Sequence, residues 1–232
     1  SLYERCPRRF LYTHILEVGG RRRETAFMKL HVAVQQVVDA IRQHGGSGAS
    51  PEELRTAFEE AWGTEGPLEH GYCEEYKAIG WQLLRFYSEC VGESELQPPQ
   101  ELRLAVDGGE IVVTPDQQLA GERGEIVMRR VNTGHKHSKD GENLAAAAFH
   151  LAATSHRPGC RVELVHLSDE KVTPVAMSAR VLENRRSSIL EMSRNVRAGH
   201  FPPKETMTCP RCPAFFICGR LPDGPYAKKT LD

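Results

Sequence analysis

The sequence lacks any run of about 18 apolar residues, which a membrane-spanning helix requires. Its first residues also lack the order of charged, apolar and small residues that marks a signal peptide. Neither charge is in surplus, since 30 Lys and Arg stand against 31 Asp and Glu. Net charge therefore gives no general attraction to a polyanion, and any basic surface has to be local. We expect a soluble, cytoplasmic protein with no membrane partner.

Two further absences concern motifs. No Gly-x-x-x-x-Gly-Lys-Ser/Thr stretch occurs, so this chain carries no P-loop ATPase site of its own. No methionine stands at position 1, and the pattern is already helical from Leu2 onward. We expect the chain to be a fragment of a longer protein, with any motor activity located outside it.

The composition favours one folded domain. Of 232 residues, 40% are apolar and 26% are charged, which is enough to bury a substantial core. We expect a single domain over 1–232 in three parts: a helical part at about 1–98, a sheet core at about 99–200 and a tail at 201–232.

Apolar residues recur at three- and four-residue steps along several segments, which is the spacing of one helix face. The expected helices span residues 2–16, 26–43, 51–62, 72–91, 144–154 and 178–198. The third begins with Ser50-Pro51-Glu52-Glu53, where an N-cap serine, a proline at the first helical position and a glutamate three residues after the cap form a capping box.

The period changes in the middle of the chain. Stretches rich in β-branched residues predict strands at 101–106, 111–114, 125–131, 161–167 and 172–176. Asp107-Gly108-Gly109 predicts a hairpin between the first two. Together these elements predict an α/β architecture whose middle part is an antiparallel sheet.

Cysteine spacing gives the most specific chemical signal. Cys209, Cys212 and Cys218 are separated by two and five residues, close enough for three sulfurs to converge. Thiols stay reduced in the cytosol, so metal ligation is favoured over disulfides. Cys6 is the candidate for a fourth ligand, because it precedes a proline at a helix start as Cys209 and Cys212 do.

Two other interpretations of these cysteines stay open. A structural zinc site usually combines two short Cys pairs, whereas Cys6 lies roughly two hundred residues from the other three. Free cysteines are also commonly buried in cores without any ligand. We interpret Cys73, Cys90 and Cys160, which have no partner spacing, as core residues of that kind.

The two ends of the chain resemble a known group of proteins. Residues 1–12, Ser-Leu-Tyr-Glu-Arg-Cys-Pro-Arg-Arg-Phe-Leu-Tyr, and the Gly199-His200-Phe201-Pro202 stretch with the cysteine triplet after it are similar to RecB-like PD-(D/E)XK nuclease domains that carry a four-iron cluster. That group includes the AddB type, C-terminal domains of UvrD/Rep-like superfamily 1 helicases and CRISPR-associated nucleases.

The resemblance implies a restriction-endonuclease-like core, a mixed sheet flanked by helices. It further implies a [4Fe-4S] cluster that closes the C-terminal tail onto the N-terminal helix. Its ligands would be Cys6, Cys209, Cys212 and Cys218. A cross-link closing so long a loop would contribute on the order of 5 kcal/mol to stability.

The family's catalytic set is incomplete in this chain. His31 matches the family's histidine on the second helix, and Asp116 matches the first metal-binding aspartate. The family's acid-x-Lys-Thr-Gly strand corresponds to residues 130–134, where Thr133 and Gly134 persist. Arg130 stands at the acid, Asn132 at the lysine and Ala145 at the later glutamine.

These replacements change the chemistry that is expected. Carboxylates in such sites hold a divalent cation that polarises a phosphate and activates water. An arginine at one of those positions repels the cation that Asp116 would have to bind alone. We expect neither a Mg²⁺ site nor nuclease activity, and instead a basic strip that meets DNA phosphates. The strip comprises Arg129, Arg130, His135, Lys136, His137 and Lys139.

Three functions follow as hypotheses. The first is a non-catalytic iron–sulfur domain that binds single-stranded or junction DNA for a nucleoid-associated helicase or repair protein, with the ATP-dependent motor domains of the same parent chain as partners. The second is an active Mg²⁺- or Mn²⁺-dependent DNA exonuclease of the AddB or CRISPR-associated type. The third is a protein-interaction scaffold that keeps the fold without binding DNA.

Overall fold

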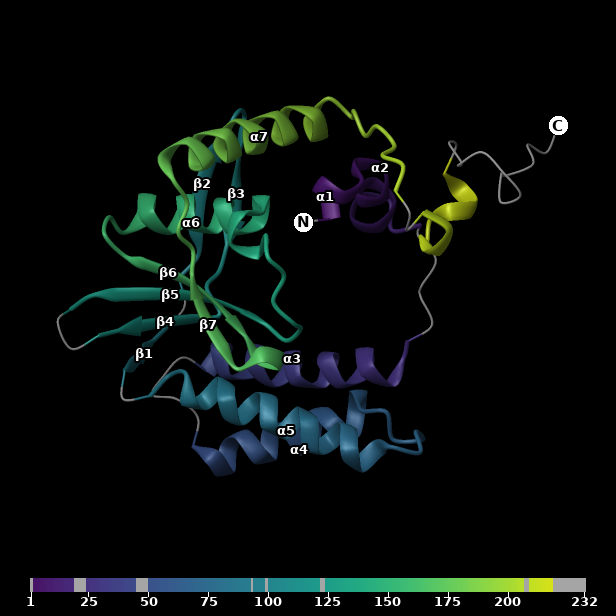
Figure 1. The fold of residues 1–232 in the computed structure, drawn as a ribbon, viewed down its shortest axis with the longest axis vertical. Helices are drawn as coiled ribbons and strands as arrows, with labels where there is room; N and C mark the ends of the chain where they lie inside the picture. The colour runs from purple at the N-terminus through teal and green to yellow at the C-terminus, as the bar shows by residue number, and fades with distance from the viewer. Residues whose placement is uncertain are drawn as a thin grey trace. The chain divides into compact units, whose positions relative to one another are not determined.

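The computed structural model describes residues 2–18, 24–44, 50–92, 94–98, 100–121, 124–206 and 209–218. The chain forms two compact units, residues 1–23 with 186–232, and residues 24–185 (Figure 1). The boundary between them falls within helix α7 (Ala179–Arg197). Residues 219–232 of the expected tail lie outside the described part. No helix among the described residues is both long and apolar enough to span a bilayer.

Three helices open the larger unit. They are α3 (Ala26–His44), α4 (Pro51–Glu65) and α5 (Cys73–Glu89). The capping box at the start of α4 forms as expected, because the Ser50 side chain accepts a hydrogen bond from the Glu53 amide at 3.2 Å and the Glu53 carboxylate accepts one from the Ser50 amide at 2.8 Å. The apolar faces of the three helices meet in one core.

A glycine sets how closely these helices approach. A Cβ atom added at Gly80 of α5 would lie 2.7 Å from the Phe58 ring of α4 and 2.9 Å from Leu30 of α3. Contacts that short require the Phe58 ring, the Leu30 side chain or a helix to shift. The absence of a side chain at this position therefore lets α5 pack against both neighbours.

The larger unit also contains a five-stranded mixed sheet in the order β1-β4-β5-β6-β7. Its strands are β1 (Glu95–Gln97), β4 (Gln117–Ala120), β5 (Ile126–Asn132), β6 (Arg161–His166) and β7 (Lys171–Pro174). Neighbours pair antiparallel except β5 and β6, which are parallel and are joined by helix α6 (Leu144–His156). Strands β2 (Leu102–Val106) and β3 (Gly109–Val113) form a separate hairpin.

Strand β5 is covered on both faces. Ile126 and Met128 pack in a core with Phe149 of α6, whereas Val131, of the opposite parity, packs in the core formed by α3, α4 and α5. Figure 1 shows α6 on one side of the sheet and the three opening helices on the other. Because β5 and β6 are parallel, their carboxyl ends lie at the same end of the sheet. The loops that follow the two strands therefore begin there.

The sequence predicts this fold class correctly and some of its details incorrectly. A mixed sheet flanked by helices is confirmed, as are six helical segments and the β2–β3 hairpin. The expectation of an antiparallel sheet in the middle of the chain is wrong, because β5 pairs parallel with β6 and the hairpin stands apart. Strands β1 and β4 were not predicted, since three or four residues are too few to show a period.

The smaller unit contains both chain ends. Its short elements are α1 (Leu2–Arg5), α2 (Pro7–Phe10), the π-helical turn η1 (Leu11–Ile15) and the 3-10 turns η4 (Cys209–Arg211) and η5 (Phe215–Ile217). The expected continuous helix over 2–16 is interrupted at Cys6, which is extended with φ −164° and caps α2. Proline disfavours a helical conformation in the residue before it, so Pro7 explains the break.

Hydrogen bonds join the N-terminal residues of this unit to its C-terminal segment. Arg8 Nε donates to the Phe201 carbonyl at 2.7 Å, and the Tyr12 hydroxyl donates to the Ile217 carbonyl at 3.0 Å. Lys204 Nζ donates to the carbonyl of Glu4 at 3.0 Å. These bonds hold segments about two hundred residues apart in sequence against each other without any metal.

Candidate cysteine site and nuclease-like centre

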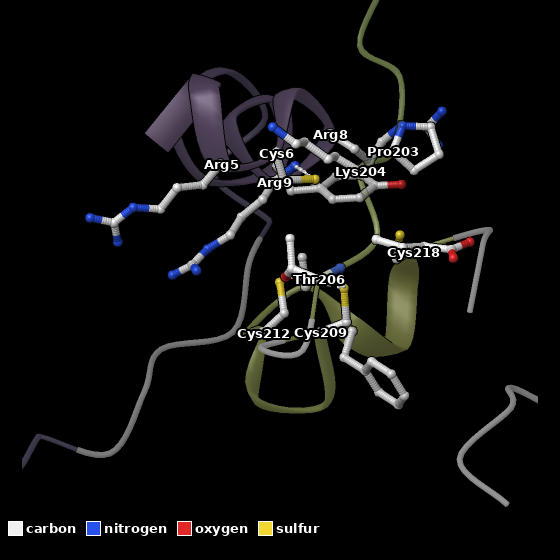
Figure 2. A pocket seen from close by; sticks show the side chains of 14 residues that line it. Arg5, Cys6, Arg8, Arg9, Pro203, Lys204, Thr206, Cys209, Cys212 and Cys218 are labelled. Carbon is white, nitrogen blue, oxygen red and sulfur yellow. Dashed lines mark hydrogen bonds between the residues drawn. The ribbon is translucent and has the colours of Figure 1, made fainter. Parts of the chain in front are cut away.

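A cavity of about 430 Å³ lies within the smaller unit, and the four predicted cysteine ligands line it. Figure 2 shows Cys6 on the helical side of this cavity and Cys209, Cys212 and Cys218 on the side of the C-terminal turns. All four are partly buried. The structure thus brings together the thiols that the sequence grouped, and it leaves Cys73, Cys90 and Cys160 in the larger unit.

Backbone N–H groups point at two of these sulfurs. The Arg9 amide donates to Cys6 Sγ at 3.5 Å, and the Thr206 amide donates to Cys209 Sγ at 3.2 Å. Hydrogen bonds to sulfur stabilise the thiolate form that ligates metal. Cys6, Cys209 and Cys212 each precede a proline, which disfavours the α conformation at the cysteine. Cys6 accordingly caps α2, Cys209 opens the short turn η4 and Cys212 follows that turn.

The charge around the cavity favours an anionic occupant. Its lining includes Arg5, Arg8, Arg9 and Lys204 against one carboxylate, Glu205. A centre held by four thiolates is negative, so these cations compensate it. Among the described residues, no three His, Cys, Asp or Glu side chains stand close enough to hold a single metal ion. The donor set of four thiols around one cavity fits a cluster in which each sulfur binds a different iron.

The nuclease-like centre lies in the larger unit, around Asp116. This residue follows β3 and precedes β4, and its side chain is 2% exposed. Its amide donates to the Arg129 carbonyl at 2.8 Å, and its Oδ2 accepts from the Val131 amide at 2.7 Å. Asp116 is therefore fixed against β5, beside Arg130, the residue matched to the family's missing acid.

Arg130 contacts this carboxylate. Its Nε lies 3.3 Å from Asp116 Oδ2, and its Nη1 donates to the Thr114 carbonyl at 2.7 Å. The residue matching made on the sequence is thus spatially coherent, because the side chain at the position of the missing acid lies next to the surviving one. It brings a positive charge where the family has a second negative one.

A second arginine completes the centre, and sequence reasoning missed it. Arg42, in the last turn of α3, donates from Nη1 to Asp116 Oδ1 at 3.1 Å, and its Nη2 lies 2.9 Å from Asp39. Burial raises the pKa of the Asp116 carboxyl, and the charge of Arg130, the Val131 amide and the charge of Arg42 offset this rise only in part. With both of its oxygens occupied, the carboxylate is held by cationic side chains.

Within the described residues, no hydrogen bond or ion pair joins Asp116 to His31, Asn132 or Ala145, the other positions matched to the family's catalytic set. The His31 ring packs edge-on against Phe27 at 4.2 Å between ring centroids, and neither of its nitrogens has a hydrogen-bond partner among the described residues. Asn132 is exposed at the end of β5, and Ala145 is exposed in the first turn of α6. Neither position offers a carboxylate for a divalent cation.

The predicted basic strip divides between two environments. Arg129 points to the other face of β5 from Arg130, where its Nε lies 2.7 Å from Glu163 and its Nη1 donates to the Cys90 carbonyl at 2.6 Å. Its side chain is only 12% exposed. A phosphate would have to displace both partners to reach Arg129, so its assignment as a DNA contact stays an untested prediction with little geometric support.

Arg130 lies in β5 beside Asp116, and the remaining four residues of the strip lie in the loop after β5. The Asp169 carboxylate contacts His135 Nδ1 at 2.8 Å and accepts from the Lys136 amide at 2.5 Å. Asp140 accepts from the His137 amide at 2.8 Å. These bonds fix the backbone, while the side chains of His137 and Lys139 are exposed. That this loop contacts DNA stays a prediction. The exposed side chains of His137 and Lys139 could reach a phosphate.

Buried histidines give the larger unit a pH dependence that can be measured. Burial lowers the pKa of His31, His150 and His166; the charge of His135 adds to this at His31, while Asp140 opposes it at His166. The unfolded chain takes up these protons more readily, so the free energy of unfolding should fall as pH drops below about 6.5. His166, which is 0% exposed, should contribute a clear share.

Denaturant unfolding at several pH values tests this expectation. His166→Phe should reduce the loss of unfolding free energy between neutral and mildly acidic pH, because it removes a site that only the unfolded chain protonates easily. His156→Gln, at an exposed position at the end of α6, is the matched control. An unchanged pH slope in the His166 variant would contradict the assignment.

Fold and site together define a class of protein: an α/β core with a mixed sheet, in which the aspartate of the Pro115-Asp116 pair is held against strand β5. Comparison with protein families matches residues 1–219 to the PD-(D/E)XK nuclease superfamily. The chain belongs to this superfamily. No curated protein matches the chain.

Proposed function

We propose that this chain is a DNA-binding, non-cleaving member of the superfamily that carries a [4Fe-4S] cluster and serves a larger helicase or repair protein. The observation that carries the proposal is the state of Asp116, whose two carboxylate oxygens are occupied by guanidinium and amide groups. A nuclease of this type needs that carboxylate for a divalent cation. Its occupation by arginines favours binding of phosphates over their hydrolysis.

The cysteine cavity supports the cluster part of the proposal. A single zinc ion would draw four sulfurs to within about 3.8 Å of one another, whereas a cavity of about 430 Å³ has room for a centre of several atoms. When bound, the cluster supplies four metal–thiolate links between Cys6 and the C-terminal turns. Together with the Arg8 and Tyr12 hydrogen bonds, such links would make the smaller unit one rigid body.

The helicase part of the proposal has a narrower basis. The resemblance of both chain ends to the C-terminal domains of UvrD/Rep-like superfamily 1 helicases supports it. Since this chain carries no P-loop motif, the proposal assigns the ATPase to another part of the parent protein. The DNA it would hold is single-stranded or junction DNA, close to the motor.

One experiment tests the core of the proposal. The chain is purified anaerobically, its iron and labile sulfide are measured, and labelled single-stranded and duplex DNA are incubated with it in Mg²⁺ or Mn²⁺. The expected result is a brown protein that binds DNA with a steep dependence on salt and leaves it intact.

Each contrary outcome points to one of the rival functions. Cleavage that disappears in Asp116→Ala would show an active nuclease. A brown, folded protein that is indifferent to DNA at low salt would indicate an interaction scaffold. Zinc in place of iron would overturn the cluster while leaving DNA binding to be judged from the same assay.

A further inference from the structure

The Asp116 centre contains two carboxylates and two guanidiniums in one chain of contacts. Asp39 contacts Arg42, Arg42 contacts Asp116, and Asp116 contacts Arg130. Asp116 is nearly inaccessible, at 2% exposed, whereas Arg130 is 41% exposed. Asp39, at the far end, is 37% exposed. At the Asp116 end the guanidinium of Arg130 therefore faces outward, and the buried carboxylate lies behind it.

The guanidinium of Arg130 is held from the inside. Its Nε faces Asp116 and its Nη1 donates to the Thr114 carbonyl. Within the described residues, Nη2 has no hydrogen-bond partner, which leaves one edge of the planar group open. A guanidinium fixed on one edge and open on the other matches the geometry by which arginine binds a phosphate oxygen.

We propose that the Asp116 centre is a metal-independent phosphate site, in which Arg130 takes the role of the divalent cation toward a DNA phosphodiester and Arg42 positions it through Asp116. The inference rests on the proposed DNA-binding function and specifies how that site works. Arg130 is the group that touches the ligand. Arg42 is a positioning residue, because it occupies the Asp116 oxygen that would otherwise be free to bind a metal ion.

The physical reason lies in the charges available to a phosphate. In a metal-dependent site, two or more carboxylates hold a dication, and the dication holds the phosphate. Here one buried carboxylate holds a permanently charged guanidinium, which needs no ion from solution. Affinity for DNA should then be independent of Mg²⁺, apart from the ordinary screening by a divalent salt.

Salt titrations of DNA binding by the full chain test the phosphate contact. In EDTA, wild-type affinity is expected to equal that in Mg²⁺ at matched ionic strength. Arg130→Gln is expected to weaken binding roughly fivefold and to lower the salt slope by about one counterion. Arg103→Gln is the matched control, since Arg103 is similarly exposed but already paired with Glu101 and Glu110; it should leave both quantities unchanged.

A metal titration without DNA tests the role of Arg42. Arg130→Glu restores an acid beside Asp116, but Arg42 still occupies the aspartate. The double variant Arg42→Gln with Arg130→Glu is expected to bind Mn²⁺ at least tenfold more tightly than Arg130→Glu alone, as seen by calorimetry or by the spectrum of free Mn²⁺. Circular dichroism confirms that each variant is folded.

The outcomes separate the inference from the function on which it rests. Binding that requires Mg²⁺ and fails in EDTA would overturn the metal-independent site. A wild-type salt slope in Arg130→Gln would remove Arg130 from the phosphate contact while DNA binding itself stands. Equal Mn²⁺ affinities of the single and double variants would overturn the role of Arg42. A wild-type chain that ignores DNA at low salt would defeat the proposed function and the inference together.

Discussion

Replacing Cys6 with Ser is expected to remove most of the iron from the purified protein and to loosen the smaller unit selectively. The thiol is one of four around the cavity, and it is the only one contributed by the N-terminal segment. A serine hydroxyl is a poor ligand for a cluster that prefers thiolates. The metal–thiolate link between the two ends of the chain would therefore be lost, while the hydrogen bonds of Arg8, Tyr12 and Lys204 would still join them.

The effect should be large and local. Opening so long a loop costs stability on the order of 5 kcal/mol in the chain-entropy estimate. The larger unit has its own helical and sheet cores. Hydrogen–deuterium exchange should therefore rise in residues 2–18 and 201–218 of the variant and remain low in the sheet, while iron analysis and visible absorbance report the cluster.

Cys160→Ser provides the matched control. Cys160 is also partly buried but lies in the larger unit, packed against the core beneath α6. This variant should retain its iron and its exchange pattern in the smaller unit. Iron content unaffected by the Cys6 change would contradict the proposed ligand set, and hence the interpretation of the cavity.

The sequence groups the cysteines that line the cavity because their signal is local and chemical. Three thiols within ten residues have little freedom to separate, and a proline after Cys6, Cys209 and Cys212 fixes how each cysteine is presented. The same proline also limits the prediction made from periodicity. It breaks the helix that the apolar spacing of residues 2–16 suggests, and it thereby turns Cys6 into a cap.

The arginines show what the sequence leaves undetermined. Arg42 reaches Asp116 across 74 positions, and no spacing rule connects a residue in the last turn of α3 with one between two strands. Arg129 and Arg130 are different, because alternation along a strand places neighbours on opposite faces. This rule places Arg129 and Arg130 on opposite faces of β5. Arg129 is the buried one, paired with Glu163, and Arg130 is the more exposed one, beside Asp116.

Asp116→Asn is expected to destabilise the larger unit by about 2–3 kcal/mol. Breaking a buried ion pair typically costs somewhat more, but Arg42 and Arg130 are partly exposed, and water would compensate part of the loss. Asparagine has nearly the same shape and can still accept from the Val131 amide through its oxygen. The change thus reports mainly the loss of the negative charge between two guanidiniums.

The sign of this effect distinguishes a structural carboxylate from a catalytic one. In a working metal site without its metal, acidic groups repel one another, and neutralising one of them stabilises the fold. In this protein the carboxylate has cationic neighbours instead. Although burial raises its pKa, neutralising it removes the anionic partner that Arg42 and Arg130 share, so the change should destabilise the fold. Glu101→Gln, which removes an exposed carboxylate from a surface pair, should change the free energy of unfolding by about 0.5 kcal/mol or less. Denaturant unfolding of the wild type, Asp116→Asn and Glu101→Gln measures both changes in the free energy of unfolding. A more stable Asp116→Asn variant would mean that the centre still carries the strain of a catalytic site.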